Sequence, residues 1–341
     1  MHAVTRRTVV GALVASPAII GASRLGRAAT RTLKISHQFP GGTLQEGDFR
    51  DRLTRRFAQD VEKRTNGELA FQIYPGESLV KAVPQFDAVR KGAIDMTLYP
   101  LAYAGGQFQE LNIGLMPCMV TSYEQGFAWK KAPIGAELTK AVEARGAKIV
   151  TWIWQAGGVA SHAGPVVEPP DVKGLKIRGG SREMDLMLGA AGGIVSSVSS
   201  AEIYPNMQTG TLDAAVTSST SLISYRLDEL AKNLTTGRGK SFWYMFEPLL
   251  MSKDIFDSLP AAQQKAVMEA GLELEPFGIQ SAKEDDARIA DIYAKAKVAI
   301  HDMSDAAVAK WRTVAEQTAW TDFAKRNADC ERFLKLAQAV A

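Results

Sequence analysis

The sequence predicts an α/β protein with two lobes and a long C-terminal helix that crosses both of them. The chain has 341 residues, which is about twice the ~150 residues that serve as a prior for one domain. Its first part alternates strand and helix patterns, as is typical of helices that cover a largely parallel sheet. From Pro260 to about Ile300 the helical pattern is nearly unbroken, and Pro276 is expected to kink or divide it.

The first lobe is expected to cover residues 31–146. Phe49, Leu53, Phe57 and Val61 recur every four residues and predict one apolar helix stripe. The expected strands are 32–37, 69–74 and 93–99, with helices at 46–64 and 83–91 between them.

The second lobe is expected to cover residues 147–255, and the helices of 256–341 should pack across both lobes. Ser181 is a suitable N-cap for a helix that contains Glu183 in its first turn. No low-complexity linker separates the lobes, so ordered segments should join them at a hinge. The expected strands are 147–155, 174–178, 194–198, 212–217 and 241–252, with helices at 181–188, 201–209 and 305–323.

The N-terminus resembles an export signal. Arg6 and Arg7 precede an apolar run that is too short to span a membrane, and small residues at Gly26 and Ala28 favour cleavage after Ala28. We therefore interpret residues 1–28 as a signal peptide. The arginine pair favours the twin-arginine route, and an ordinary Sec signal is the alternative. Either route predicts a periplasmic protein.

Charge and motifs exclude several classes of function. Without the four arginines of the first 28 residues, 36 basic residues face 37 acidic ones, so the body lacks the basic excess of a nucleic-acid-binding protein. The sequence has no nucleophile elbow, no phosphate loop and no zinc-protease motif.

The two cysteines, Cys118 and Cys330, are expected to be separate buried thiols. We expect no enzyme activity, no cofactor and no metal site, and we interpret Glu284-Asp285-Asp286 as a solvated helix face.

Arg178 is the leading candidate for a binding residue. It ends the short strand that closes Asp171-Val-Lys-Gly-Leu-Lys-Ile-Arg178, and ligands of α/β sheets bind beyond the carboxyl ends of strands. Arginine presents a planar fork that matches a carboxylate with two parallel hydrogen bonds. From the strand alone, a surface salt bridge remains the alternative.

Five motifs in order resemble the solute-binding proteins of TRAP transporters (tripartite ATP-independent periplasmic transporters), the DctP family. They are FAQDVEKRTNGELAFQIYPGESL, VRKGAIDM, DVKGLKIR followed by LGAAGG, EIYPNMQTGTLD, and SKDIFDSLPAAQQKAVMEAG. The resemblance covers essentially the whole mature chain. It implies a class II-like, two-lobed periplasmic binding protein that closes on its ligand and delivers it to membrane permease subunits.

The resemblance also implies site residues. The arginine of the KGLKIR motif clamps a ligand carboxylate in this family, and that role falls on Arg178. The other positions that match family pocket segments are Tyr99, Trp154, Gln155, Thr217, Ser218 and Trp243. For each of these six, packing in the core or at the surface is the alternative.

Two departures from the family pattern narrow the ligand. Many relatives have a second arginine where this chain has Gly157-Gly158-Val159, and Ala215 and Val216 replace polar residues of the family. We therefore expect a small monocarboxylate with a partly apolar body, in preference to a dicarboxylate or an acidic sugar. Partnership with a periplasmic sensor or chemoreceptor is an alternative role, a periplasmic enzyme is a weaker one, and dimerisation through the long helix stays open.

Overall fold

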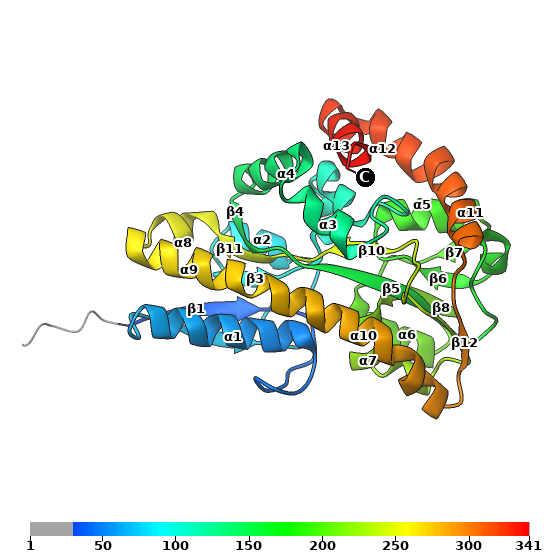
Figure 1. Cartoon of the computed structure of the whole chain (residues 1–341), viewed down its shortest axis with the longest axis horizontal. Coiled ribbons are helices and arrows are strands. Elements are labelled where there is room, and N and C mark those ends of the chain that lie inside the picture. Colours follow the sequence, from blue (N-terminus) through cyan, green and yellow to red (C-terminus); the bar gives the residue numbers. More distant parts are fainter. Residues whose placement is uncertain (1–29, 341) are drawn as a thin grey trace, which may run out of the picture.

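The computed structural model describes residues 30–340, and their strands form two sheets that define two lobes (Figure 1). The first sheet has the strand order β2-β1-β3-β11-β4. The second has the order β12-β9-β5-β8-β6-β7, and β10 pairs with β5 outside this path. The signal segment expected at residues 1–28 lies outside the described residues.

Lobe 1 is built on a mixed sheet covered by helices. β1 runs parallel to β2 and β3, whereas β11 runs antiparallel to β3 and β4. Helix α1 begins after its N-cap Asp48 and buries the predicted apolar stripe. The strands are β1 (Arg31–Ser36), β2 (Leu69–Tyr74), β3 (Met96–Leu98), β4 (Ala147–Thr151) and β11 (Leu249–Ser252), and the helices are α1 (Phe49–Arg64), α2 (Gln85–Arg90), α3 (Tyr123–Trp129), α4 (Pro133–Ala144), α8 (Lys253–Asp257) and α9 (Ala261–Glu273).

Lobe 2 is centred on the long strand β5, which is antiparallel to β8, β9 and β10. β6 runs parallel to β7 and β8, and the Ser181 side chain caps the helix that follows β6, as expected. The strands are β5 (Trp154–Ser161), β6 (Lys176–Arg178), β7 (Ile194–Val195), β8 (Ala214–Ser218), β9 (Asn233–Thr235), β10 (Tyr244–Phe246) and β12 (Ala299–His301), and the helices are α5 (Arg182–Ala190), α6 (Ile203–Gln208) and α7 (Ser219–Ser224).

The chain crosses between the lobes at two strand junctions. The strand expected at 147–155 is two strands, with β4 in the first sheet and β5 in the second, so this crossing falls at Trp152–Ile153 and not at Ala147. The strand expected at 241–252 is likewise divided into β10 and β11. The crossings are adjacent, because the Glu247 backbone N–H donates to the Ile153 carbonyl at 2.9 Å. The first segment passes through its junction at the apolar Trp152-Ile153, so its sequence pattern shows no break, whereas the second has Glu247-Pro248 at its junction.

Helix α10 (Glu275–Lys295) runs across both lobes (Figure 1), contacting α1 in lobe 1 and α7 in lobe 2. Pro276 lies in its first turn and separates it from α9, as predicted. The C-terminal helices then return from lobe 2, where α11 contacts α5, to lobe 1, where α13 contacts α4. These helices are α11 (Asp305–Ala315), α12 (Thr321–Arg326), which follows a π-helical turn at Glu316–Trp320, and α13 (Ala328–Gln338).

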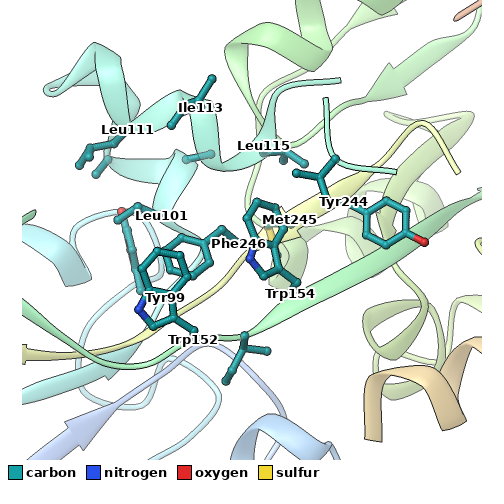
Figure 2. Close-up of a cluster of buried hydrophobic side chains, with 14 of the residues drawn as sticks. Tyr99, Leu101, Leu111, Ile113, Leu115, Trp152, Trp154, Tyr244, Met245 and Phe246 are labelled. Carbon is teal, nitrogen blue, oxygen red and sulfur yellow. The ribbon is translucent and has the colours of Figure 1, made fainter. Parts of the chain in front are cut away.

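An apolar cluster braces the crossings (Figure 2). The rings of Trp152 and Trp154 both pack against Phe246, with centroids 4.5 and 5.3 Å apart, and Trp154 meets the edge of Trp129 at 5.2 Å. Each crossing strand therefore contributes rings to one shared core. Cys118 and Cys330 are free and buried, as expected. Within residues 30–340, no helix is both long and apolar enough to cross a membrane.

We predict that Gly271→Ala in α9 destabilises the protein although alanine favours helix. A Cβ at this position would lie 2.3 Å from the Val150 carbonyl oxygen of β4, so the expected overpacking cost is about 1–3 kcal/mol of unfolding free energy. The matched control is Gly189→Ala in α5, where a Cβ meets nothing within 4 Å and the change should stabilise by up to ~1 kcal/mol. Chemical denaturation measures both, and equal effects would contradict the packing of α9 on β4.

Candidate functional site

Arg178 lies at the carboxyl end of β6 and is buried, with 2% of its surface exposed. Its Nε donates to the Val198 carbonyl at 3.0 Å and its Nη1 to the Val216 carbonyl at 2.8 Å. Gly180, which has a φ of 96°, lets the turn pass beneath the guanidinium, since a Cβ there would lie 2.6 Å from Nη1. Backbone carbonyls thus fix the orientation of the guanidinium group.

Among residues 30–340, Arg178 forms no ion pair with a carboxylate. Asp185 interacts electrostatically with the guanidinium, but its side chain accepts a hydrogen bond from Ser197. Burial raises the pKa of Asp185 and the charge of Arg178 opposes that rise. Three of the five N–H donors of Arg178 are used by its three hydrogen bonds. The two remaining donors belong to a buried cation that has no direct ion pair among the described residues, with Asp185 acting on it only at longer range.

Arg50, in the first turn of α1, is a second buried arginine at the boundary between the lobes. The Asp48 carboxylate accepts hydrogen bonds from its Nε at 2.9 Å and its Nη2 at 2.7 Å, and its guanidinium lies 3.7 Å from the Phe39 ring centroid. Nη2 also donates to Ser221 Oγ at 3.0 Å, and Nη1 lies 3.4 Å from Ser218 Oγ. Arg50 therefore contacts lobe 2 with a counterion already bound.

Two tyrosines complete the polar contacts between the lobes. Tyr103, in the 3-10 segment Leu101–Gly106 of lobe 1, accepts hydrogen bonds from Arg178 Nη2 at 2.8 Å and from the Ser200 backbone at 3.0 Å. Tyr225 of lobe 2 donates to the Gln38 carbonyl of lobe 1 at 3.0 Å. The two lobes are therefore in contact around both arginines.

Glu247 occupies the second crossing and is fully buried. Its Oε2 accepts a hydrogen bond from Gln155 Nε2 and lies 3.5 Å from Arg50 Nη1. Burial raises the pKa of Glu247 to about 7, with Arg50 lowering it and Asp48 raising it. Within the described residues, Glu247 Oε1 has no hydrogen-bond partner.

The structure gathers some of the predicted residues and separates others. Arg178 bonds the Val216 carbonyl of β8, the strand that ends in Thr217 and Ser218. Trp243 lies beside the same strand: a Cβ added at Gly157 would be 2.4 Å from both the Trp243 ring and the Thr217 carbonyl. Gln155 lies instead at Glu247.

Tyr99 and Trp154 lie in the apolar cluster of Figure 2. The Tyr99 hydroxyl donates to the Val83 carbonyl at 2.9 Å, and its ring supports Tyr103 at 6.0 Å between centroids. Trp154 packs between Trp129 and Phe246. These contacts account for both rings as packing elements behind the lobe boundary.

Sequence reasoning missed five residues of this boundary, and only one carried a usable signal. Asp48 before an apolar helix stripe marks a helix start, which places Arg50 in a first turn but does not indicate that it is buried. The remaining four acquire their roles only when segments distant in sequence meet. The missed residues are Gln38, Arg50, Tyr103, Tyr225 and Glu247.

Several buried polar side-chain atoms at this boundary have no hydrogen-bond partner among the described residues. Leaving a buried polar atom unsatisfied costs about 1–3 kcal/mol, so each of these atoms favours a hydrogen-bonding partner from water or a ligand. They are Gln38 Nε2 and Oε1, Gln155 Oε1, Glu247 Oε1 and Trp243 Nε1.

The acidic residues Glu284-Asp285-Asp286 on α10 are only partly exposed to solvent. We interpreted Glu284-Asp285-Asp286 as a solvated face, which is wrong for two of its residues, since Asp285 and Asp286 are buried. Tyr123 of lobe 1 donates to Asp286 at 2.6 Å and Thr220 of lobe 2 donates to Asp285 at 2.7 Å. The two aspartates thus tie α10 to both lobes. In the part of the chain that the structure describes, no cluster of three or more His, Cys, Asp or Glu side chains forms a candidate metal site.

Two α/β lobes that are joined by paired strand crossings and meet around a buried, unpaired guanidinium define a two-lobed ligand-binding protein. The family model for bacterial extracellular solute-binding proteins, family 7 (DctP), matches residues 41–327. The chain belongs to this family, which confirms the resemblance and the fold class drawn from the sequence. It is a TRAP-type solute-binding receptor and not an enzyme.

Known relatives agree with this assignment. A solute-binding protein of Albidiferax ferrireducens is 57% identical over 314 residues, covering 92% of this chain and 93% of that protein. A crystal structure of a TRAP periplasmic solute-binding protein from Rhodoferax ferrireducens with bound malonate is 57% identical, with a TM-score of 0.89, and covers 90% of this chain and 98% of that one. The C4-dicarboxylate-binding periplasmic protein DctP of Rhodobacter capsulatus is 25% identical over 93% of this chain and 91% of that protein.

We predict that Tyr103→Phe weakens the contact between the lobes. The change removes the acceptor of Arg178 Nη2 and of the Ser200 amide, so the mean separation of the lobes should increase, which small-angle scattering detects as a larger radius of gyration. Tyr204→Phe is the control, because that hydroxyl bonds Glu229 within lobe 2. An unchanged radius in the Tyr103 variant would show that this hydroxyl does not hold the lobes together.

Proposed function

We propose that this chain is the periplasmic receptor of a TRAP-type secondary transporter, and that it captures a small monocarboxylate with a partly apolar body by closing its two lobes. The ligand would then pass to the membrane permease subunits. Membership of the family supports the receptor role. The choice of a carboxylate rests on one observation, which is the buried guanidinium of Arg178 without an acidic partner.

A ligand carboxylate would satisfy Arg178 in both charge and geometry. The planar guanidinium offers parallel N–H donors that match the two oxygens of a carboxylate. Val198 and Val216 already hold two of its nitrogens, so the fork is oriented before the ligand arrives. Breaking a buried charge pair by removing one partner costs on the order of 3–5 kcal/mol, and binding should depend strongly on this residue.

The charges at the boundary favour one ionised carboxylate in the ligand. Arg50 is already paired with Asp48 at 2.7 Å, which leaves Arg178 as the unneutralised cation. The Rhodoferax relative was crystallised with malonate, a dicarboxylic acid, and calorimetry with mono- and dicarboxylic acids compares the two ligand classes on this chain.

We assign the ligand contacts to Arg178, Thr217, Ser218, Gln155 and Trp243. The Trp243 ring lies against Gly157 beside Thr217 and would supply the apolar surface for the body of the ligand. Hydroxyl groups at the end of β8 and the free Gln155 Oε1 would supply hydrogen bonds.

Closure would be driven by the contacts that the ligand makes with both lobes at once. A ligand shifts a conformational equilibrium only by its differential affinity for the two states. Here the Arg178–Tyr103, Tyr225–Gln38 and Arg50–Ser221 hydrogen bonds join the lobes, and a carboxylate on Arg178 would add to them only in the closed state.

We predict that Arg178→Ala abolishes detectable binding of small carboxylic acids in titration calorimetry. The loss should be at least about a hundredfold, which corresponds to the ~3–5 kcal/mol cost of losing one partner of a buried charge pair. Arg178→Lys should also bind weakly, because an ammonium group lacks the planar fork.

Arg182→Ala is the matched control, because Arg182 is an exposed arginine four residues away that pairs with Asp322. This variant should bind like the wild type. Wild-type affinity in Arg178→Ala would remove Arg178 from the site and overturn the proposed mode of capture. Mass spectrometry of ligand released from the purified protein identifies the natural acid.

A further inference from the structure

We propose that Glu247 is a specificity-determining residue, whose free Oε1 receives a hydrogen-bond donor at the end of the ligand remote from Arg178. The receptor would then select a small carboxylic acid that also carries a hydroxyl, an amide or a protonated carboxyl group, and would discriminate against a fully ionised dicarboxylate. This inference rests on the proposed function, in which Arg178 binds the first carboxylate.

Glu247 is held rigidly at the boundary between the lobes. Its backbone N–H is bonded to Ile153 at the neighbouring crossing, and its Oε2 is occupied by Gln155 Nε2. The other oxygen, Oε1, is buried and has no hydrogen-bond partner among the described residues. A fixed, buried and unoccupied acceptor is the kind of group that a bound molecule must satisfy.

A short chain of contacts connects Glu247 to Arg178. Arg50 Nη1 lies 3.5 Å from Glu247 Oε2 and 3.4 Å from Ser218 Oγ. Ser218 is two residues beyond Val216 on β8, and the Val216 carbonyl accepts the hydrogen bond from Arg178 Nη1. Both arginines therefore lie at the same end of β8, and in this proposal the ligand held by Arg178 extends toward Glu247.

The buried amide of Gln38 is a further polar group at the lobe boundary without a partner among the described residues. Both its Nε2 and its Oε1 lack partners within the described residues, and its backbone carbonyl is tied to Tyr225 at the same boundary. Gln38 can both donate and accept, as a hydroxyl or amide on the ligand requires. A purely apolar ligand would leave this amide and Glu247 Oε1 unsatisfied together.

The local charges explain the discrimination against a second carboxylate. Asp48 binds both Nε and Nη2 of Arg50, so the charge of Arg50 is already balanced before Glu247 is counted. When Glu247 is ionised, the group of Arg50, Asp48 and Glu247 carries one net negative charge. A second ionised carboxylate beside it would meet like-charge repulsion in a buried site, whereas a neutral donor would not.

The protonation of Glu247 should tune this selectivity within the physiological pH range. Burial raises its pKa to about 7, Arg50 and the Gln155 hydrogen bond lower it, and Asp48 raises it. Below that pH, protonated Glu247 can donate to an ionised carboxylate of the ligand, and above it Glu247 can only accept. A hydroxyl group suits both forms, because it donates and accepts.

Titration calorimetry with malonate and with 3-hydroxypropionate tests the proposal, using the full mature protein and Glu247→Gln. Raising the pH from about 6.5 to about 8.5 should weaken the affinity of the wild type for malonate, relative to that of Glu247→Gln, at least about tenfold. The affinity for 3-hydroxypropionate should change less than about threefold over the same range in either protein. The ionisation of malonate itself is the same for both proteins, so the ratio of their affinities isolates the effect of Glu247.

Glu183→Gln is the matched control. Glu183 is also fully buried, and burial raises its pKa to about 8, but it pairs with Arg326 of α12. This variant should show the wild-type pH dependence for both acids. A loss of selectivity in Glu183→Gln would indicate a general effect of removing a buried charge.

Unfolding curves verify that Glu247→Gln is folded and provide a second measurement. Because the pKa of Glu247 is raised in the folded state, wild-type stability should fall as the pH rises from the unfolded pKa through about 7, and the glutamine variant should lose that part of the pH dependence.

The outcomes separate this inference from the proposed function. If Arg178→Ala binds these acids like the wild type, the proposed capture by Arg178 fails. A different result overturns only the role of Glu247. In that case Arg178→Ala loses binding, but the ratio of the malonate affinities of the wild type and Glu247→Gln stays constant across the pH range. If the wild type binds neither acid, the ligand class inferred here is overturned, and Arg178 is then tested with other acids.

Discussion

The burial of the Arg178 guanidinium without an acidic partner is the constraint on which the rest of the site depends. A buried charge needs compensation, and the chain supplies only part of it through two backbone carbonyls and the Tyr103 hydroxyl. That arrangement requires three segments to meet: the end of β6, the strand β8 beside it and the segment after β7. It also requires Gly180, because its left-handed φ and missing Cβ let the turn pass under the guanidinium. The second sheet therefore holds a buried cation whose only direct partners among the described residues are neutral groups.

The two strand crossings are the places where the chain passes from one sheet to the other, and they lie side by side. The crossings are bonded to each other through Glu247 and Ile153, and their tryptophans share one core with Phe246 (Figure 2). On the long helix α10, Asp286 is bonded to Tyr123 of lobe 1 and Asp285 to Thr220 of lobe 2. The core beneath the crossings and the helix across them therefore both connect the two lobes.

Much of the fold could be predicted from the sequence, because it is recorded in local patterns. The apolar stripe of α1, the cap at Ser181 and the break at Pro276 all follow from residues close in sequence. The crossings could not be predicted in the same way. The segment 147–155 is apolar and extended throughout, so nothing in it marks the change from one sheet to the other.

The site residues also fall into those that local sequence predicts and those that depend on contacts between distant segments. Arg178 could be selected from its strand and motif, but whether a lysine, arginine or glutamate is paired depends on tertiary neighbours. Arg50 and Glu247 are 197 positions apart in sequence and 3.5 Å apart in the structure. Tyr99 and Trp154 were selected because they match pocket segments of the family, and the sequence pattern does not reveal that these rings pack into the apolar cluster.

Arg50 and Arg178 show how the same residue type can serve closure in two ways. Arg50 is bound to Asp48, so its contacts with Ser218 and Ser221 bring a balanced pair against lobe 2 at little electrostatic cost. Arg178 has no such partner, so bringing lobe 1 over it removes water from an uncompensated charge. In the proposed mode of capture, a ligand carboxylate would remove that penalty and make the closed state more favourable with ligand than without it. The coupling between binding and closure would then arise mainly from the difference in charge balance between two arginines at one boundary.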